Sequence, residues 1–364
     1  MDENIIINGE TIHEMSRLDS HSIDLIFADP PYFMQTSGIL HRVEGTEFNG
    51  CQDDWDKFDS LDSYINFTRQ WLTQCKRLLK HNASIWVIGS MQCIYIIGSV
   101  MQELGFWIIN DVIWHKTNPT PNFMGTRLNN SHETLIWAVP DKSSRYTFHY
   151  KTAKALFTEN PGRQMGSVWR IPVCSGSERL KDSNGKKIHS TQKPLKLLER
   201  VIAISSNLND LVLDPFAGTM TTGAAAKKLG RKYIMIEADK NYCTAGEARL
   251  ANIEFSDSPE ARADYDIKPK RVKIQEMIQA GAFITGESFY LPDGKECAKL
   301  LNDGKLLIDN QVIDMHSGAA LAKGLRAKRV NGFEVWHVMR NNKLVSINTI
   351  RENYRNSQEA LQER

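Results

Sequence analysis

One short segment, Asp29-Pro30-Pro31-Tyr32, sets the strongest constraint on how this chain can fold. It follows the apolar run 23–28, which has the length and composition of a buried β-strand. Two consecutive prolines cannot continue the hydrogen-bonded ladder of a sheet, so the chain must leave the sheet here. An acid and an aromatic side chain are therefore placed together at the carboxyl end of a strand, where open α/β sheets bind their ligands.

Segments typical of strands and of helices alternate through the first two thirds of the chain, which indicates a mostly parallel sheet. We expect helices at 11–18, 61–80, 91–104, 194–202 and 224–229. We expect strands at 5–7, 23–28, 84–89, 106–114, 134–139, 211–214 and 232–237. The sequence thus predicts an α/β domain over residues 1–255 with a mostly parallel, seven-stranded sheet.

The composition changes after residue 254. Residues 256–271 are polar and charged and are predicted to be a linker. Residues 272–364 contain a short helix pattern and brief strands, with turns at Asp293-Gly294 and Asp303-Gly304. We interpret them as a separate small α+β module.

A second motif, residues 214–223, lies between an expected strand and an expected helix. Gly218 permits close approach of the backbone to a ligand, and the exposed amides of the following helix can hold an anion. Glu237 ends the next strand, where a carboxylate can accept hydrogen bonds from both hydroxyls of a ribose. Gly218 alone is compatible with an ordinary strand-to-helix turn, but the turn and the acid together favour a site for an adenosine-containing cofactor.

Composition restricts the class of protein further. The net charge of +2 neither requires nor excludes a polyanionic partner, and 41% hydrophobic residues suffice for a packed core. The six cysteines form no Cys-x-x-Cys pair, so we expect no metal site. The N-terminus lacks the pattern of a signal peptide, and no apolar run is long enough to span a bilayer. We therefore expect a cytoplasmic protein without a membrane partner.

The two motifs, in this order, resemble those of β-class DNA adenine-N6 methyltransferases, which depend on S-adenosylmethionine. More narrowly, the chain is similar to the bacterial cell-cycle-regulated and the restriction-system members that modify GANTC. The resemblance rests on further stretches: Asp54-Trp55-Asp56-Lys57-Phe58, Trp86-Val87-Ile88-Gly89-Ser90, Pro121-Asn122-Phe123, Gly125-Thr126-Arg127, His132-Glu133-Thr134 and Thr191-Gln192-Lys193-Pro194. It implies a Rossmann-like methyltransferase domain that flips the target base and transfers the methyl group directly.

The resemblance also implies roles for individual residues. Catalysis would fall to Asp29, Pro30, Pro31 and Tyr32, with the Asp29 carboxylate and the Pro30 carbonyl accepting the amino hydrogens of adenine and Tyr32 stacking on the base. The cofactor-binding residues would be Glu10, Lys193, Asp214, Pro215, Phe216, Gly218, Thr219, Thr221, Thr222 and Glu237. From the sequence alone, Lys193 is equally compatible with a solvated lysine at the start of a helix.

Two positions depart from the family pattern. Met220 replaces the second glycine of the cofactor turn, and we expect its side chain to crowd the methionine end of the cofactor. Glu10 replaces an aspartate and would reach further to the cofactor adenine.

We expect DNA recognition by residues 116–190, which form a target-recognition insert, and by the C-terminal module. Asparagine side chains can pair with adenine edges and arginine with guanine, whereas lysines and arginines neutralise phosphates. The candidates are Trp55, Asn118, Asn122, Arg127, Asn129, Lys323, Arg326, Lys328 and Arg329. Each basic residue taken singly is equally typical of a solvated surface charge.

Three functions remain open from the sequence. The first is N6-adenine methylation, which Asp29 favours. The second is methylation of cytosine N4, or of an amine or amide in RNA or protein. The third is DNA binding without a working cofactor site, which only Met220 supports. DNA is the expected partner, a homodimer and a companion restriction endonuclease are further expectations, and the family resemblance suggests association with a bacterial nucleoid.

Overall fold

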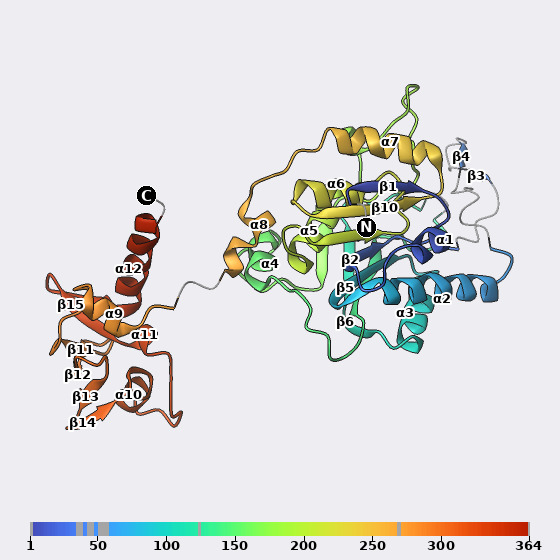
Figure 1. Ribbon diagram of the computed structural model, residues 1–364. Coiled ribbons are helices and arrows are strands. Elements are labelled where there is room, and N and C mark those ends of the chain that lie inside the picture. Colours follow the sequence, from blue (N-terminus) through green and yellow to red (C-terminus); the bar gives the residue numbers. More distant parts are fainter. Residues whose placement is uncertain are drawn as a thin grey trace. The chain divides into compact units, whose positions relative to one another are not determined.

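The computed structural model describes residues 3–33, 39–41, 47–49, 58–122, 125–267 and 271–362. The chain forms two compact units, Met1–Ile267 and Lys268–Arg364 (Figure 1). Among the residues that are described, no helix is both long and apolar enough to cross a membrane.

An eight-stranded mixed sheet forms the centre of the N-terminal unit. In spatial order its strands are β1 (Ile5–Asn8), β10 (Lys232–Glu237), β9 (Leu211–Asp214), β2 (Ile23–Ala28), β5 (Leu79–Gly89), β7 (His132–Val139), β6 (Trp107–Lys116) and β8 (Val168–Ile171). The first five are parallel, β7 is antiparallel to both of its neighbours, and β8 is parallel to β6. A separate short pair, β3 (Ile39–His41) and β4 (Glu47–Asn49), is antiparallel.

The expected count of seven strands is wrong because β8 lies within residues 116–190, the expected target-recognition insert, where the sequence predicted no strand after 139. Only two of its four residues are buried, Trp169 and Ile171, so the apolar pattern is short and is surrounded by basic residues. Tertiary contacts stabilise it instead: Trp114 Nε1 donates to the Ile171 carbonyl oxygen at 2.8 Å.

Helices cover both faces of the sheet (Figure 1). One face carries α1 (Thr11–Ser16), α2 (Leu61–Leu78) and α3 (Ile94–Glu103); the other carries α4 (Tyr150–Leu156), α5 (Leu195–Ser205), α6 (Thr221–Lys228) and α7 (Lys240–Ala251). Strand β2 contributes to the hydrophobic cores on both faces of the sheet, because its successive side chains point to opposite faces. Leu25 and Phe27 join the core beneath α5, whereas Ile26 and Ala28 join the core beneath α2.

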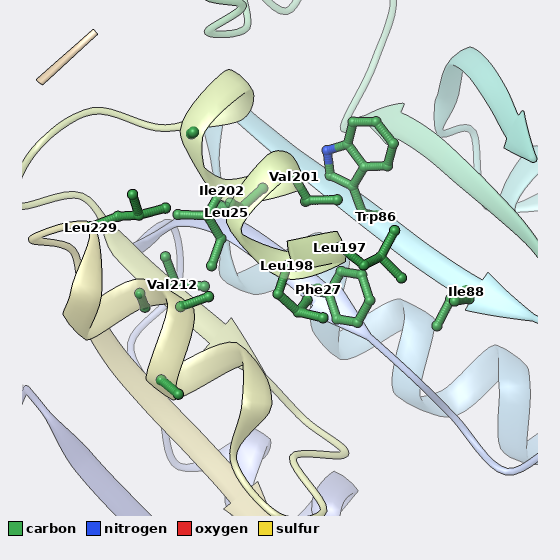
Figure 2. Packing of buried hydrophobic residues seen from close by; sticks show 14 of the residues in the cluster. Leu25, Phe27, Trp86, Ile88, Leu197, Leu198, Val201, Ile202, Val212 and Leu229 are labelled. Carbon is green, nitrogen blue, oxygen red and sulfur yellow. The ribbon is translucent and has the colours of Figure 1, made fainter. Parts of the chain in front are cut away.

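Helix α5 shows how the core holds these elements in place. Its residues Leu197, Leu198, Val201 and Ile202 are fully buried and pack with side chains of β2, β5 and β9 (Figure 2). Burial of each such side chain stabilises the fold by about 1.5–3 kcal/mol. The segment immediately before α5, which contains Lys193, is therefore anchored to the centre of the sheet.

The expected linker 256–271 is only partly a linker. Its first part forms α8 (Pro259–Arg262) and the 3-10 helix η3 (Asp264–Asp266), and both pack on α4. The Asp266 carboxylate accepts hydrogen bonds from the Lys151 and Thr152 amides at 2.8 Å each. The boundary between the units follows Ile267, because residues before it are fixed by these contacts.

The C-terminal unit has its own core and its own sheet. The antiparallel order is β14 (Gln311–Ile313), β13 (Leu306–Ile308), β12 (Glu296–Leu300), β11 (Ser288–Tyr290), β15 (His337–Arg340) and β16 (Lys343–Ser346). Its helices are α9 (Ile274–Gln279), α10 (Met315–Ala322), α11 (Gly332–Val335) and α12 (Ile347–Gln362). The two Asp-Gly turns expected from the sequence lie between β11 and β12 and between β12 and β13, with positive φ at Gly294 and Gly304. Phe289 and Trp336 are fully buried in this second core.

Candidate active site

One cavity of about 260 Å³ lies at the carboxyl ends of β1, β10, β9 and β2. Every residue that the sequence predicted to be catalytic or cofactor-binding lines this cavity. The four strands bring together segments that are as much as 229 residues apart, because neighbouring parallel strands end at the same edge of a sheet.

The Asp29–Tyr32 turn is held by α2. Tyr64 on this helix donates its hydroxyl hydrogen to the Pro31 carbonyl oxygen at 2.8 Å. Phe33 adopts a positive φ of 52° and its ring stacks on Tyr64 with the centroids 5.4 Å apart. Because Tyr64 is itself fully buried, the geometry of the turn depends on the packing of α2.

A buried cluster of charged residues surrounds Asp29. Its Oδ1 accepts a hydrogen bond from the Tyr32 hydroxyl at 2.8 Å, and its Oδ2 accepts one from Lys193 Nζ at 2.7 Å. Glu133, at the start of β7, contacts the same two donors: its Oε2 lies 3.0 Å from the Tyr32 hydroxyl and 3.8 Å from Lys193 Nζ. Its other oxygen accepts from Lys116 Nζ at 2.6 Å. Two carboxylates and two ammonium groups thus share one buried site.

The charges in this cluster stabilise one another. Burial raises the pKa of the Asp29 carboxyl, and the adjacent Lys193 ammonium limits that rise. Burial would also raise the pKa of Glu133, but Lys193 and Lys116 together lower it below its ordinary value. Burial works against the charged form of Lys193, yet the two carboxylates raise its pKa. Lys193 is therefore a cation and Glu133 an anion at neutral pH.

Residues of the 214–223 turn form another part of the cavity lining. Asp214 is buried, and its carboxylate accepts hydrogen bonds from the Phe216 amide at 2.9 Å and the Thr222 hydroxyl at 2.5 Å. Burial raises the pKa of Asp214 to about 7. No ion pair of Asp214 occurs within the described part of the chain. A cationic ligand in the cavity would therefore favour the ionised carboxylate.

Glu237 fixes this turn against β10. Its carboxylate accepts from the Gly218 amide and the Asp239 amide, each at 2.8 Å. Gly218 has a positive φ of 51°, and a Cβ there would lie 3.2 Å from His189 Nε2. Only glycine combines this backbone conformation with so close a neighbour.

Comparison with known proteins agrees with this geometry. The DNA methylase family model matches residues 23–248, more than half of the chain. The sequence is 45% identical over 353 residues to the type II methyltransferase M.HinfI of Haemophilus influenzae, an alignment that covers 97% of each chain.

The chain belongs to the DNA methylase family.

It is thus a DNA methyltransferase, and further relatives support this assignment. It is 39% identical over 247 residues to the type II methyltransferase M2.DpnII of Streptococcus pneumoniae, covering 68% of this chain and 89% of that relative. Among solved structures, the cytosine-N4-specific PvuII DNA methyltransferase aligns with a TM-score of 0.53 at 18% identity, over 70% of this chain and 89% of its own. That likeness shows a common fold, which confirms the Rossmann-like methyltransferase architecture.

The expectation that Met220 crowds the cofactor cavity of this methylase is wrong. Met220 has a left-handed backbone, with φ 60° and ψ 37°, and its side chain is fully buried in the core. It faces Gly246 of α7, where it occupies the place that a Cβ would need. The residue does not line the cavity.

Glu10 of the methylase already serves as the N-cap of α1. Its carboxylate accepts hydrogen bonds from the Ile12 amide at 3.0 Å and the His13 amide at 2.8 Å. A contact with the cofactor adenine would have to share these oxygens. The predicted role of Glu10 stays a prediction.

The predicted DNA contacts fall into three groups. Trp55 lies outside the described residues. Asn118 and Asn122 stabilise loops, since Asn118 Oδ1 accepts from the Val173 amide and Asn122 Nδ2 donates to the Arg127 carbonyl oxygen, each at 2.8 Å. The remaining candidates are solvent-exposed, namely Arg127, Asn129, Lys323, Arg326, Lys328 and Arg329.

Sequence reasoning assigned no role to four residues near this site. His189 and Tyr242 line the cavity with their ring centroids 4.8 Å apart. His189 lies two residues before the Thr191–Pro194 motif, and this proximity was the signal for it. Glu133 and Lys116 belong to the charged cluster; the signal for Glu133 was an acid at the start of an otherwise apolar strand.

Proposed function

We propose that this methylase transfers a methyl group from S-adenosylmethionine to the exocyclic N6 of adenine in DNA, with GANTC as its site. The observation that carries the proposal is the single cavity shared by the Asp29–Tyr32 turn and the 214–223 turn. A base held by the first turn and a cofactor held by the second would meet within it. GANTC itself is proposed from the motif resemblance described above.

The cofactor side fits S-adenosylmethionine by its chemistry. Asp214 is a buried carboxylate without an ion-pair partner in the described residues, which suits a ligand that carries positive charge. Glu237 ends β10 at the cavity, where it can accept hydrogen bonds from ribose hydroxyls. Phe216 contributes an apolar wall, supported edge-on by Trp71 with the ring centroids 5.4 Å apart. When bound, the cofactor supplies an electrophilic methyl group.

The base side fits an exocyclic amino group. Such a nitrogen is a weak nucleophile because its lone pair is delocalised into the ring. The Asp29 carboxylate and the Pro30 carbonyl accept its two hydrogens, which returns electron density to nitrogen and orients it. Positioning and electrostatic stabilisation then provide most of the rate enhancement. Tyr32 stacks on the base, which must leave the duplex to reach this buried turn.

DNA binding rests on exposed basic residues of both units. Arg127 follows β6 in the N-terminal unit, and four basic residues lie at 323–329 in the C-terminal unit. Their charges neutralise phosphates, so affinity for DNA falls steeply with added salt. A flat salt dependence would contradict this part of the proposal. A homodimer and a companion endonuclease remain predictions from the resemblance.

The test combines binding with product analysis. We expect the protein to bind S-adenosylmethionine in a calorimetric titration and to place labelled methyl groups on GANTC duplexes but not on duplexes with the site scrambled. Hydrolysis of the product to nucleosides should yield N6-methyladenine. N4-methylcytosine, or label on RNA or protein alone, would support the alternative substrates. Absence of cofactor binding would support a DNA-binding protein without activity.

A single substitution tests the central residue. Asp29→Ala should abolish transfer while the dissociation constant for the cofactor changes by no more than about twofold, because Asp29 serves the base rather than the cofactor. Glu103→Ala, which removes an exposed carboxylate paired with Arg69, is the matched control and should keep full activity. Full activity in Asp29→Ala would refute the assigned role.

A further inference from the structure

The two groups that donate hydrogen bonds to Asp29 share a second acceptor. The Tyr32 hydroxyl lies 2.8 Å from Asp29 Oδ1 and 3.0 Å from Glu133 Oε2. Lys193 Nζ lies 2.7 Å from Asp29 Oδ2 and 3.8 Å from the same Oε2. One oxygen of Glu133 thus lies close to both groups that donate hydrogen bonds to Asp29, the Tyr32 hydroxyl and the Lys193 ammonium.

This arrangement weakens Asp29 as an acceptor for the target amino group while both donors stay on it. Each of its oxygens already accepts a hydrogen bond, so the amino group would have to share an oxygen with Tyr32 or Lys193. The amino nitrogen also gains positive charge as the methyl group arrives. An ammonium on Asp29 opposes that charge and weakens the carboxylate as an acceptor. The tyrosine hydroxyl has one hydrogen, so it can serve only one of the two carboxylates fully at a time.

We propose that Glu133 is a positioning residue that takes over the Lys193 ammonium and the Tyr32 hydroxyl when the target amino group binds Asp29. The inference rests on the function proposed above, because it requires an amino group as the substrate of Asp29. Lys193 has the flexible side chain that such an exchange needs. Only a short shift separates its present place from hydrogen-bonding distance to Glu133.

Glu133 is well placed for this role. It lies on a strand of the central sheet, and its other oxygen is held by Lys116 at 2.6 Å. Lys116 in turn lies over the ring of Trp114, 5.3 Å from its centroid. These contacts keep Glu133 ionised and oriented whether or not a base is bound. The Glu133 carboxylate can therefore accept a hydrogen bond from the Lys193 ammonium in both states.

The charged groups around Asp29 determine how a substitution of Glu133 would change the pKa of Asp29. Besides burial, which raises the pKa of Asp29, three side chains shift it: Lys193 and the Tyr32 hydroxyl lower it, and Glu133 raises it. Burial raises the pKa of Cys93 and of Asp214, and the charge of Asp29 in turn raises both further. Removing the charge of Glu133 should therefore lower the pKa of Asp29 while leaving Lys193 fixed on it.

The experiment measures methyl transfer by Glu133→Gln with saturating cofactor and GANTC duplex across the pH range. The glutamine keeps the shape and an acceptor oxygen for Tyr32 but not the charge. We expect kcat on the pH plateau to fall roughly 10- to 100-fold. The acid limb of the profile should move to lower pH, because Asp29 must be ionised to act. Cofactor affinity should stay at the wild-type value, and Glu103→Gln is the matched control for loss of one carboxylate.

A second variant distinguishes a loss of activity caused by unfolding from one caused by the missing Glu133 charge. Glu133→Gln leaves the mostly buried charge of Lys116 without its partner, whereas Glu133→Gln with Lys116→Met removes both charges together. The double variant should show the same lower plateau and the same shifted limb. An unchanged plateau, or a fall in kcat with the acid limb in its wild-type place, would overturn the inference while leaving the proposed function intact. Wild-type protein that methylates no DNA would overturn the proposed function, and this inference with it.

Discussion

Asp214 links the ionisation of a single carboxyl to the stability of the whole N-terminal unit. Burial raises its pKa to about 7, whereas an aspartate in an unfolded chain has a pKa of about 3.9. Between about pH 4 and pH 7 the unfolded chain therefore loses a proton that the folded protein keeps. The stabilisation that the protonated Asp214 carboxyl provides is fully present below about pH 4. It is lost as the pH rises to about 7, the pKa of Asp214 in the folded protein.

We predict that Asp214→Asn removes this pH dependence. The free energy of unfolding of the variant, relative to wild type, should rise between about pH 4 and pH 7 by up to about 4 kcal/mol. Urea denaturation of the cofactor-free protein at several pH values measures the difference. Asp19→Asn, at an exposed position, is the control. Parallel pH curves for wild type and Asp214→Asn would contradict the prediction.

At the scale of elements, helix α4 is capped by a residue that lies outside residues 1–255, the α/β domain predicted from the sequence. Its residue before the first turn, His149, provides no side-chain cap. The Asp266 carboxylate supplies it instead, accepting from two backbone amides and from the Thr152 hydroxyl at 2.8 Å. These hydrogen bonds also lower the pKa of Asp266 against the opposing effect of burial.

We predict that Asp266→Ala lowers the free energy of unfolding by about 0.5–2 kcal/mol, the usual cost of a lost helix cap. Hydrogen exchange should increase first in the amides of residues 151–156. Asp264→Ala removes an exposed acid from the same short helix and should leave both quantities unchanged. Equal effects of the two substitutions would argue against a capping role.

On the scale of the whole molecule, the two units have separate hydrophobic cores. The N-terminal unit contains the cavity and every predicted catalytic and cofactor-binding residue. The C-terminal unit contains the basic residues at 323–329, and its own core includes Phe289 and Trp336. We therefore propose that cofactor binding and part of DNA binding belong to different units.

We predict that residues 1–267 alone fold and bind S-adenosylmethionine with the affinity of the full chain. Affinity for DNA should fall, and the slope of log affinity against log salt should become shallower by roughly 0.9 for each phosphate contact that is lost. Calorimetry and DNA titrations at several salt concentrations measure both. DNA affinity equal to that of the full chain would show that the C-terminal unit makes no contact with DNA.

The sequence by itself determined the class of fold and most of the segments that form the cavity. Apolar periodicity is a local property, so it located the strands of the parallel half of the sheet. The proline pair and the glycine turn marked where two of these strands end. Because neighbouring parallel strands end at one edge, the motifs at 29–32 and 214–223 could be expected to meet, and the cavity contains them both.

Only the tertiary structure decided the features that depend on contacts between distant residues. Strand β8 and the helices at 259–266 are too short to give a pattern and are held by their neighbours. The direction of Met220 follows from the space left at Gly246. The charged cluster joins Tyr32 to Glu133 across 101 residues and Asp29 to Lys193 across 164 residues. No local pattern encodes such pairings, because the free energy that selects them arises only when the folded chain buries these charges together.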